Sequence, residues 1–66
     1  MTKFIDMTEL WHEGEYQQVA TIIVNEDWPP RRVAEFVVYF SKYVGIDDSQ
    51  VLCKLIWEHL INMKKN

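Results

Sequence analysis

Two adjacent prolines, Pro29 and Pro30, divide the chain near its middle and constrain its fold more than any other feature. Proline has no backbone N–H and its ring clashes with the preceding turn, so neither residue fits inside a helix. Both fit at a helix entrance, where the first amides have no partner within the helix. Pro29 also pushes Trp28 toward an extended conformation. The sequence therefore predicts that one element ends before Trp28 and that a helix begins at the proline pair.

Apolar residues on both sides of this break recur with the spacing of a helix. The positions are Tyr16, Val19, Ala20 and Ile23 before it, and Val33, Phe36, Val37, Phe40 and Val44 after it. This spacing collects apolar side chains on one face and predicts two amphipathic helices. The run FVVYF, residues 36–40, would also suit a strand. The prolines in front of it and the spacing that continues through Val44 favour a helix.

Helix start and stop signals divide the remaining chain. Asp6 followed by Glu9 forms a capping-box pattern, and Asp47 followed by Gln50 forms a similar one. Gly14 lies where the first of these helices is expected to end, because glycine readily takes the left-handed conformation of a helix C-terminus. We therefore expect one helix near each end of the chain.

Composition supports a packed domain. The chain has 66 residues, of which 48% are hydrophobic, and it contains three each of Trp, Tyr and Phe. A chain of this length builds one core, so residues 1–66 are expected to form a single domain. The predicted fold class is all-α, a compact bundle of three to four short helices at about 6–13, 15–26, 29–44 and 47–64. The bundle has three helices instead of four if the segments 6–13 and 15–26 act as one bent helix.

Charge and cysteine content limit the environment and the partners. The net charge of −3 argues against nucleic acid or an anionic membrane as the partner, since both attract dense basic surfaces. The longest apolar run has five residues, far short of a membrane span. The first residues lack the long apolar core of a secretory signal. Cys53 is the only cysteine, which favours a reducing compartment. We expect a cytoplasmic protein without membrane contact.

Residues 10–20 resemble the turn between the two helices of a tetratricopeptide repeat. Gly14, Glu15 and Tyr16 match that turn, and Ala20 lies one residue beyond the expected small residue. The resemblance covers roughly fifteen residues and has no second copy at the repeat period, whereas a solenoid needs stacked neighbours. We therefore interpret this segment as a generic helical hairpin.

Residues 40–52 resemble the turn of a DNA-binding helix-turn-helix. The matching positions are Phe40, Val44, Gly45 and Val51. The resemblance implies that the second helix offers its first residues to the major groove. Here those residues include Asp47 and Asp48, and two carboxylates are repelled by phosphate-rich DNA. We do not expect nucleic-acid binding, but a transcription-associated protein that uses this turn is the alternative function.

Residues able to carry chemistry are few and scattered. His12 and His59 are the only histidines, and Cys53 lies six residues from His59, which puts the two on different faces of a helix. Cys53 has no base nearby in the sequence and is interpreted as a small apolar filler, while His59 falls in an apolar row. The carboxylates gather at predicted helix ends, where capping explains them. We expect no catalytic, metal or cofactor site, and so no enzyme.

The last predicted helix is apolar over an unusually wide arc. One side carries Val51, Leu52, Leu55, Ile56, His59 and Met63, and the adjacent side carries Cys53, Trp57, Leu60 and Ile61. A surface helix needs an apolar stripe of little more than about 100°, and this arc is about twice as wide. We predict that the helix has one neighbour inside the domain and another outside it. The alternative is a helix threaded through the centre of the bundle.

These patterns together predict a small acidic helical protein-binding module, such as an adaptor, inhibitor or regulatory subunit. Its partner is expected to be another protein or a second copy in a homodimer, and its contact surface is an apolar helix face. Trp28 is either buried under the helix entrance, which we favour, or an exposed anchor. The candidate protein-binding residues are Cys53, Trp57, Leu60, Ile61 and Trp28.

Overall fold

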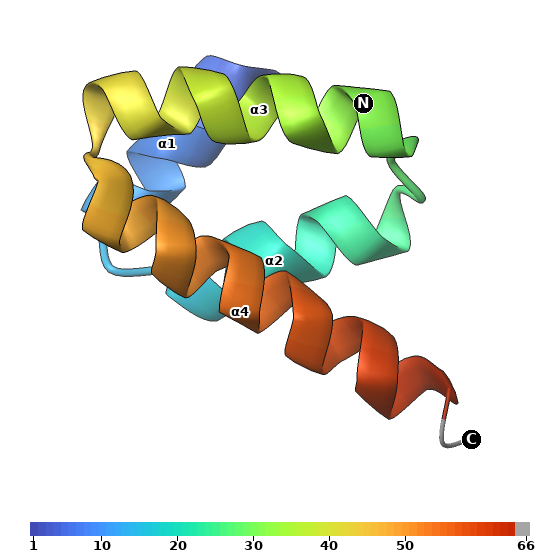
Figure 1. Ribbon diagram of the computed structural model, residues 1–66. Coiled ribbons are helices and arrows are strands. Elements are labelled where there is room, and N and C mark those ends of the chain that lie inside the picture. Colours follow the sequence, from blue (N-terminus) through green and yellow to red (C-terminus); the bar gives the residue numbers. More distant parts are fainter. Residues whose placement is uncertain (65–66) are drawn as a thin grey trace.

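The computed structural model describes the backbone of residues 1–64 and the side chains of residues 1–62. Four α-helices form this part of the chain (Figure 1): α1 (Phe4–His12), α2 (Tyr16–Asn25), α3 (Pro30–Tyr43) and α4 (Ile46–Lys64). The predicted all-α bundle of three to four short helices is confirmed, and every predicted helix end lies within two residues of the observed one. None of the described helices is both long and apolar enough to cross a membrane.

The turn between α1 and α2 closes with a left-handed glycine. Gly14 has a φ of 85°, and its amide bonds to the carbonyl of Trp11 at 3.0 Å. The amide of Glu15 bonds to the carbonyl of Leu10, also at 3.0 Å. These two bonds satisfy carbonyls that the end of α1 leaves without helical partners. The predicted stop at Gly14 is therefore confirmed.

The turn between α2 and α3 has the same geometry without a glycine. Asp27 takes a φ of 54°, and the amides of Asp27 and Trp28 bond to the carbonyls of Val24 at 3.1 Å and Ile23 at 3.2 Å. Aspartate tolerates this conformation better than most residues do. The turn carries Trp28 back over the end of α2, and Pro30 then begins α3 in the position predicted for the proline pair.

Both predicted capping boxes are wrong. α1 begins at Phe4, two residues before Asp6, and its N-cap residue Lys3 makes no side-chain capping bond. α4 begins at Ile46, so Asp47 lies within its first turn. Both aspartates still lie where the positive end of the helix dipole favours a negative charge. For α1, packing explains the earlier start, because the Phe4 ring contacts Phe36 with centroids 5.1 Å apart.

The core draws on all four helices and on the α2–α3 turn. Its buried side chains are Met7, Trp11, Val19, Ala20, Ile23, Trp28, Phe36, Phe40, Leu52 and Ile56. Phe36 and Phe40, from the predicted apolar face of α3, are fully buried at the centre, and the Trp11 ring meets the Phe40 ring edge-on at 5.0 Å. Such edge-to-face pairs are the preferred arrangement of aromatic rings. The apolar spacing therefore identified the inner face of α3, and that of α2 except at Tyr16, which is 48% exposed.

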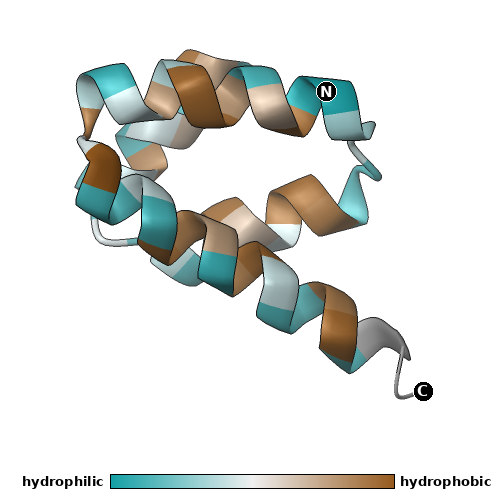
Figure 2. Cartoon of the chain, in the orientation of Figure 1, coloured by the Kyte–Doolittle hydropathy of each residue, from teal (hydrophilic) through white to brown (hydrophobic). Residues whose placement is uncertain are grey.

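The helices are arranged so that α4 has only part of its length covered. α1 packs on α2 and α3, and α4 packs chiefly on α2 and α3. In Figure 1 the C-terminal end of α4 projects beyond the other three helices. Figure 2 shows that hydrophobic residues continue along α4 into this projecting part. The bundle therefore leaves apolar surface of its longest helix uncovered.

Candidate protein-binding surface

The inner face of α4 holds the helix against the bundle. Leu52 and Ile56 are buried, and Leu55 and His59 are half-buried. His59 lies at the edge of the contact with α2, where its Nε2 donates to the side-chain oxygen of Gln17 at 2.9 Å. Val51, which was predicted to share this inner face, is instead 47% exposed. The side chain of Met63, predicted for the same face, lies outside the described residues.

A second face of α4 points into solvent. Five residues of this face, which we call the outer stripe, are Ile46, Gln50, Cys53, Trp57 and Leu60, and all five are exposed. Trp57 is 63% exposed and Ile46 is 69% exposed. Ile61, beside the stripe, is also exposed. A helix threaded through the centre of the bundle would bury these side chains, so that alternative is wrong.

An apolar groove runs beside the end of the outer stripe. It has a volume of about 540 Å³ and is lined by Asp27, Trp28, Pro30, Val33, Ala34, Ile56 and Leu60. Leu60 belongs both to the stripe and to the groove, so the two surfaces are continuous. Trp28 is only 6% exposed, which confirms that its side chain is buried at the entrance of α3. Four of the five candidate residues are therefore exposed on α4, and the fifth contributes to the groove wall.

A cluster of polar contacts holds Trp28 in this position. Its Nε1 donates to Glu26 at 2.8 Å, and Glu26 also accepts bonds from the amide of Thr2 at 2.8 Å and from the Thr2 hydroxyl at 2.6 Å. The guanidinium of Arg32 lies 4.3 Å from the centre of the Trp28 ring and 4.7 Å from that of Phe4, and it donates to the carbonyl of Thr2 at 2.8 Å. We call these residues the Glu26 clasp. The clasp ties the start of the chain to the α2–α3 turn.

The Glu26 clasp also sets the charge of its central carboxylate. Glu26 has a pKa of about 2 instead of its ordinary 4.5. The largest cause is the bond from the Thr2 hydroxyl, followed by those from Trp28 Nε1 and from the Thr2 amide. Each donor favours the ionised form. The sequence does not reveal this cluster, because Thr2 and Glu26 lie 24 residues apart and match no motif.

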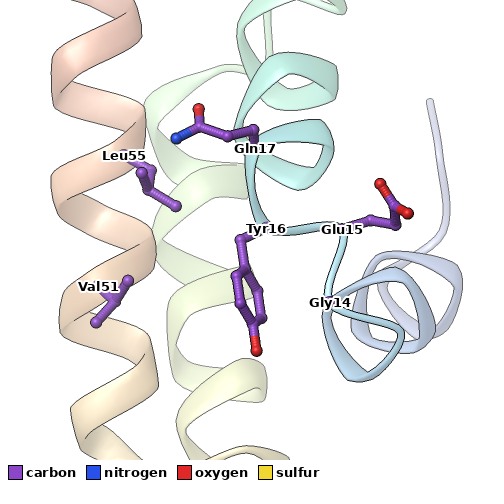
Figure 3. A pocket seen from close by; sticks show the side chains of 6 residues that line it. All are labelled: Gly14, Glu15, Tyr16, Gln17, Val51 and Leu55. Carbon is purple, nitrogen blue, oxygen red and sulfur yellow. The ribbon is translucent and has the colours of Figure 1, made fainter.

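A second hollow lies at the other end of the molecule, between the α1–α2 turn and α4. Val51 and Leu55 of α4 line it together with Tyr16, and Figure 3 shows Leu55 extending toward α2 while Glu15 points away from α4. The hollow has a volume of about 380 Å³. The Tyr16 ring packs on the Trp11 ring with centroids 4.5 Å apart, so it does not cover Val51. The exposure of Val51 follows from where α2 begins.

α3 and α4 are joined by a short turn at the predicted position, with Gly45 at a φ of 108°. Asp48 is half-buried and accepts a bond of 3.4 Å from Nε1 of Trp11, whereas Asp47 is exposed. Among the described residues, no three His, Cys, Asp or Glu side chains gather into an arrangement that would hold a metal ion. Comparisons with protein-family models, with curated proteins and with solved structures found no match.

Proposed function

We propose that this protein is a small binding module that acts on another protein chain, as an adaptor, inhibitor or regulatory subunit, through the outer stripe of α4. The observation that carries the proposal is the exposure of Trp57, 63%, on a helix whose opposite face forms part of the core. Tryptophan is among the residues that dominate the binding energy of protein interfaces. Contiguous exposed apolar surface on a small domain usually marks such an interface.

The end of the outer stripe differs from single exposed apolar residues such as Val38 and Ile5 in adjoining an apolar groove. Val38 on α3 is 59% exposed and Ile5 on α1 is 56% exposed, and neither lines this groove. The stripe joins Trp57 to Leu60 and through Leu60 to the groove at Trp28. A ridge beside a groove is the shape that receives an amphipathic helix. The partner therefore presents an apolar helical surface.

We also propose that the protein works in the cytoplasm. Cys53 is an exposed thiol in the middle of the stripe. In an oxidising compartment such a thiol is open to mixed disulfides, whereas cytosolic reductants keep it free. A reduced thiol keeps the stripe apolar and available for a partner.

Capture from an extract of the native host tests the proposal. Wild type, Trp57→Lys and Val38→Lys are immobilised separately, and the retained proteins are quantified by mass spectrometry. Both variants place a lysine at a strongly exposed apolar position, but only Trp57 lies on the stripe. We expect a partner that wild type and Val38→Lys retain and that Trp57→Lys loses. Equal retention by all three, with circular dichroism showing that each is folded, counts against the stripe as the binding surface.

A further inference from the structure

From Gln50 to Leu60 the spacing of the outer stripe is the same in both directions along α4. Gln50, Cys53, Trp57 and Leu60 are separated by three, four and three residues, and Ile46 precedes Gln50 by four. An alternation of three and four gives an average repeat of 3.5 residues, which is the spacing of a coiled-coil contact. The four residues from Gln50 to Leu60 are symmetric about residue 55. A helix with this spacing can pack against an inverted copy of itself.

We propose that the partner seated on the outer stripe is α4 of a second copy of this chain, running antiparallel about a two-fold axis beside residue 55. The inference rests on the proposed function, because it takes the stripe to be a protein-binding surface. In this register Cys53 faces Trp57 of the second copy, and Gln50 faces its Leu60. Two-fold dimers are the commonest soluble assemblies, and their interface must be complementary to itself. The stripe meets that condition.

Side-chain size favours the antiparallel register over a parallel one. Cys53 is small and Trp57 is large, so pairing them across the axis fills each layer with one small and one large side chain. The symmetry repeats this pair twice. A parallel pair would bring two tryptophans together in one layer and two cysteines in the next, which crowds one layer and leaves the other underpacked.

The helix dipoles favour the same arrangement. An antiparallel pair opposes the dipoles of the two copies of α4, whereas a parallel pair would place their like ends together. Lys54 meets its own counterpart near the axis, at an exposed position where the repulsion is small.

The area available predicts a weak dimer. α4 has 19 residues, so at 1.5 Å per residue and a width of about 10 Å it offers a footprint of roughly 280 Å². Stable complexes bury about 800 Å² of accessible surface on each partner. The stripe therefore needs the neighbouring groove wall, including Pro30 and Ala34, to contribute. We expect a dissociation constant of about 10–100 µM.

Sedimentation equilibrium tests the association between about 10 µM and about 1 mM, a range that spans the expected dissociation constant. We expect the mass of wild type and of Val38→Lys to rise toward twice the 7.9 kDa of the chain, and that of Trp57→Lys to stay at 7.9 kDa. Gln50→Leu should tighten the dimer by at least about tenfold, because a leucine then faces Leu60. This gain is informative even if Trp57→Lys unfolds.

Spin labelling tests the register. A nitroxide is attached to Ile46→Cys in a Cys53→Ser background, and the distance between the two labels is measured by double electron–electron resonance. Residue 46 lies nine residues from the axis, so antiparallel copies hold the labelled positions about 27 Å apart along the helices. Parallel copies would hold them directly opposite each other, at roughly 10 Å. We expect the long distance.

The outcomes separate the dimer from the proposed function. A wild type that stays monomeric to about 1 mM overturns the dimer, as does association that neither Trp57→Lys nor Gln50→Leu alters. A short label distance overturns the antiparallel arrangement. If the wild type is monomeric but captures another protein only when Trp57 is intact, the proposed function stands without the dimer. If it is monomeric and its captured proteins do not depend on Trp57, both fail.

Discussion

The indole of Trp28 donates a 2.8 Å hydrogen bond to Glu26, two residues earlier, across the left-handed Asp27. This contact fixes the orientation of the ring that closes the core beneath the entrance of α3. The same ring forms part of the groove beside Leu60. The α2–α3 turn therefore links the stability of the bundle to the shape of its candidate binding surface, and it can be tested by substitution.

Trp28→Ala should lower the free energy of unfolding by about 3–5 kcal/mol, because it opens a cavity beside Phe36 and removes a buried aromatic ring. The matched control is Trp57→Ala, which removes the same side chain from an exposed position. In dilute solution we expect it to change stability by less than about 0.5 kcal/mol. Urea unfolding followed by far-UV circular dichroism measures both. Similar losses for the two variants would contradict the burial pattern.

The Glu26 clasp predicts a specific loss of stability in acid. The pKa of the Glu26 carboxyl group is lowered from 4.5 to about 2, so the folded state favours the ionised carboxylate. A lowered pKa contributes stability that is fully present above the ordinary value and is lost as the pH falls toward the folded value. The contribution of Glu26 should therefore disappear between about pH 4.5 and pH 2.

Glu26→Gln isolates this contribution from the titration of the other carboxylates. The variant should melt at a lower temperature than wild type near neutral pH, and the difference should shrink as the pH falls toward 2. Thermal melts at several pH values measure the effect. A difference that stays constant across this range would show that the ionised carboxylate contributes no pH-dependent stability at this position.

Substitutions at Asp27 test how much stability the protein loses by placing a non-glycine residue in a left-handed turn. Glycine adopts a φ of 54° without strain, so Asp27→Gly should stabilise the protein by up to about 1 kcal/mol. Asp27→Val should destabilise it by about 1–2 kcal/mol, since a β-branched side chain disfavours this conformation. Chemical denaturation compares the two variants. Equal stability for both would mean that the turn relaxes out of the left-handed region.

DNA binding should be absent at moderate salt. The first turn of α4 carries Asp47 and Asp48, which repel phosphates where a recognition helix would approach them. Fluorescence anisotropy with labelled duplexes at two salt concentrations measures this. Asp47→Lys serves as a reversed-charge comparison, in which weak, salt-sensitive binding is expected to appear. Tight, sequence-selective binding by wild type would support the transcription-associated alternative instead.

Much of the fold was predictable because glycine, proline and apolar spacing act locally. Gly14 and Pro30 placed two helix boundaries, and the spacing around Phe36 identified the inner face of α3. The predictions of helix starts were wrong where contacts between residues far apart in the sequence outweigh local capping preferences. Phe4 packs on Phe36, so α1 extends past the capping residue Asp6.

The candidate surface was predictable to a similar extent. A helix as apolar as α4 has more surface than three short neighbours can cover, which correctly indicated that Trp57, Leu60 and Ile61 are exposed. Periodicity alone could not show that the α1–α2 turn leaves Val51 uncovered. The Glu26 clasp was also beyond reach, because its residues meet only after the chain has folded back on itself.

The position of Cys53 at the middle of the outer stripe makes the surface chemically addressable. It is the only thiol in the sequence, so an alkylating reagent reacts with this side chain and with no other thiol. A partner lying along α4 shields the sulfur, and the rate of alkylation then reports the fraction of the surface that is occupied. A bulky maleimide, once attached, blocks the same face. One natural residue thus provides both a probe of occupancy and a means of abolishing it.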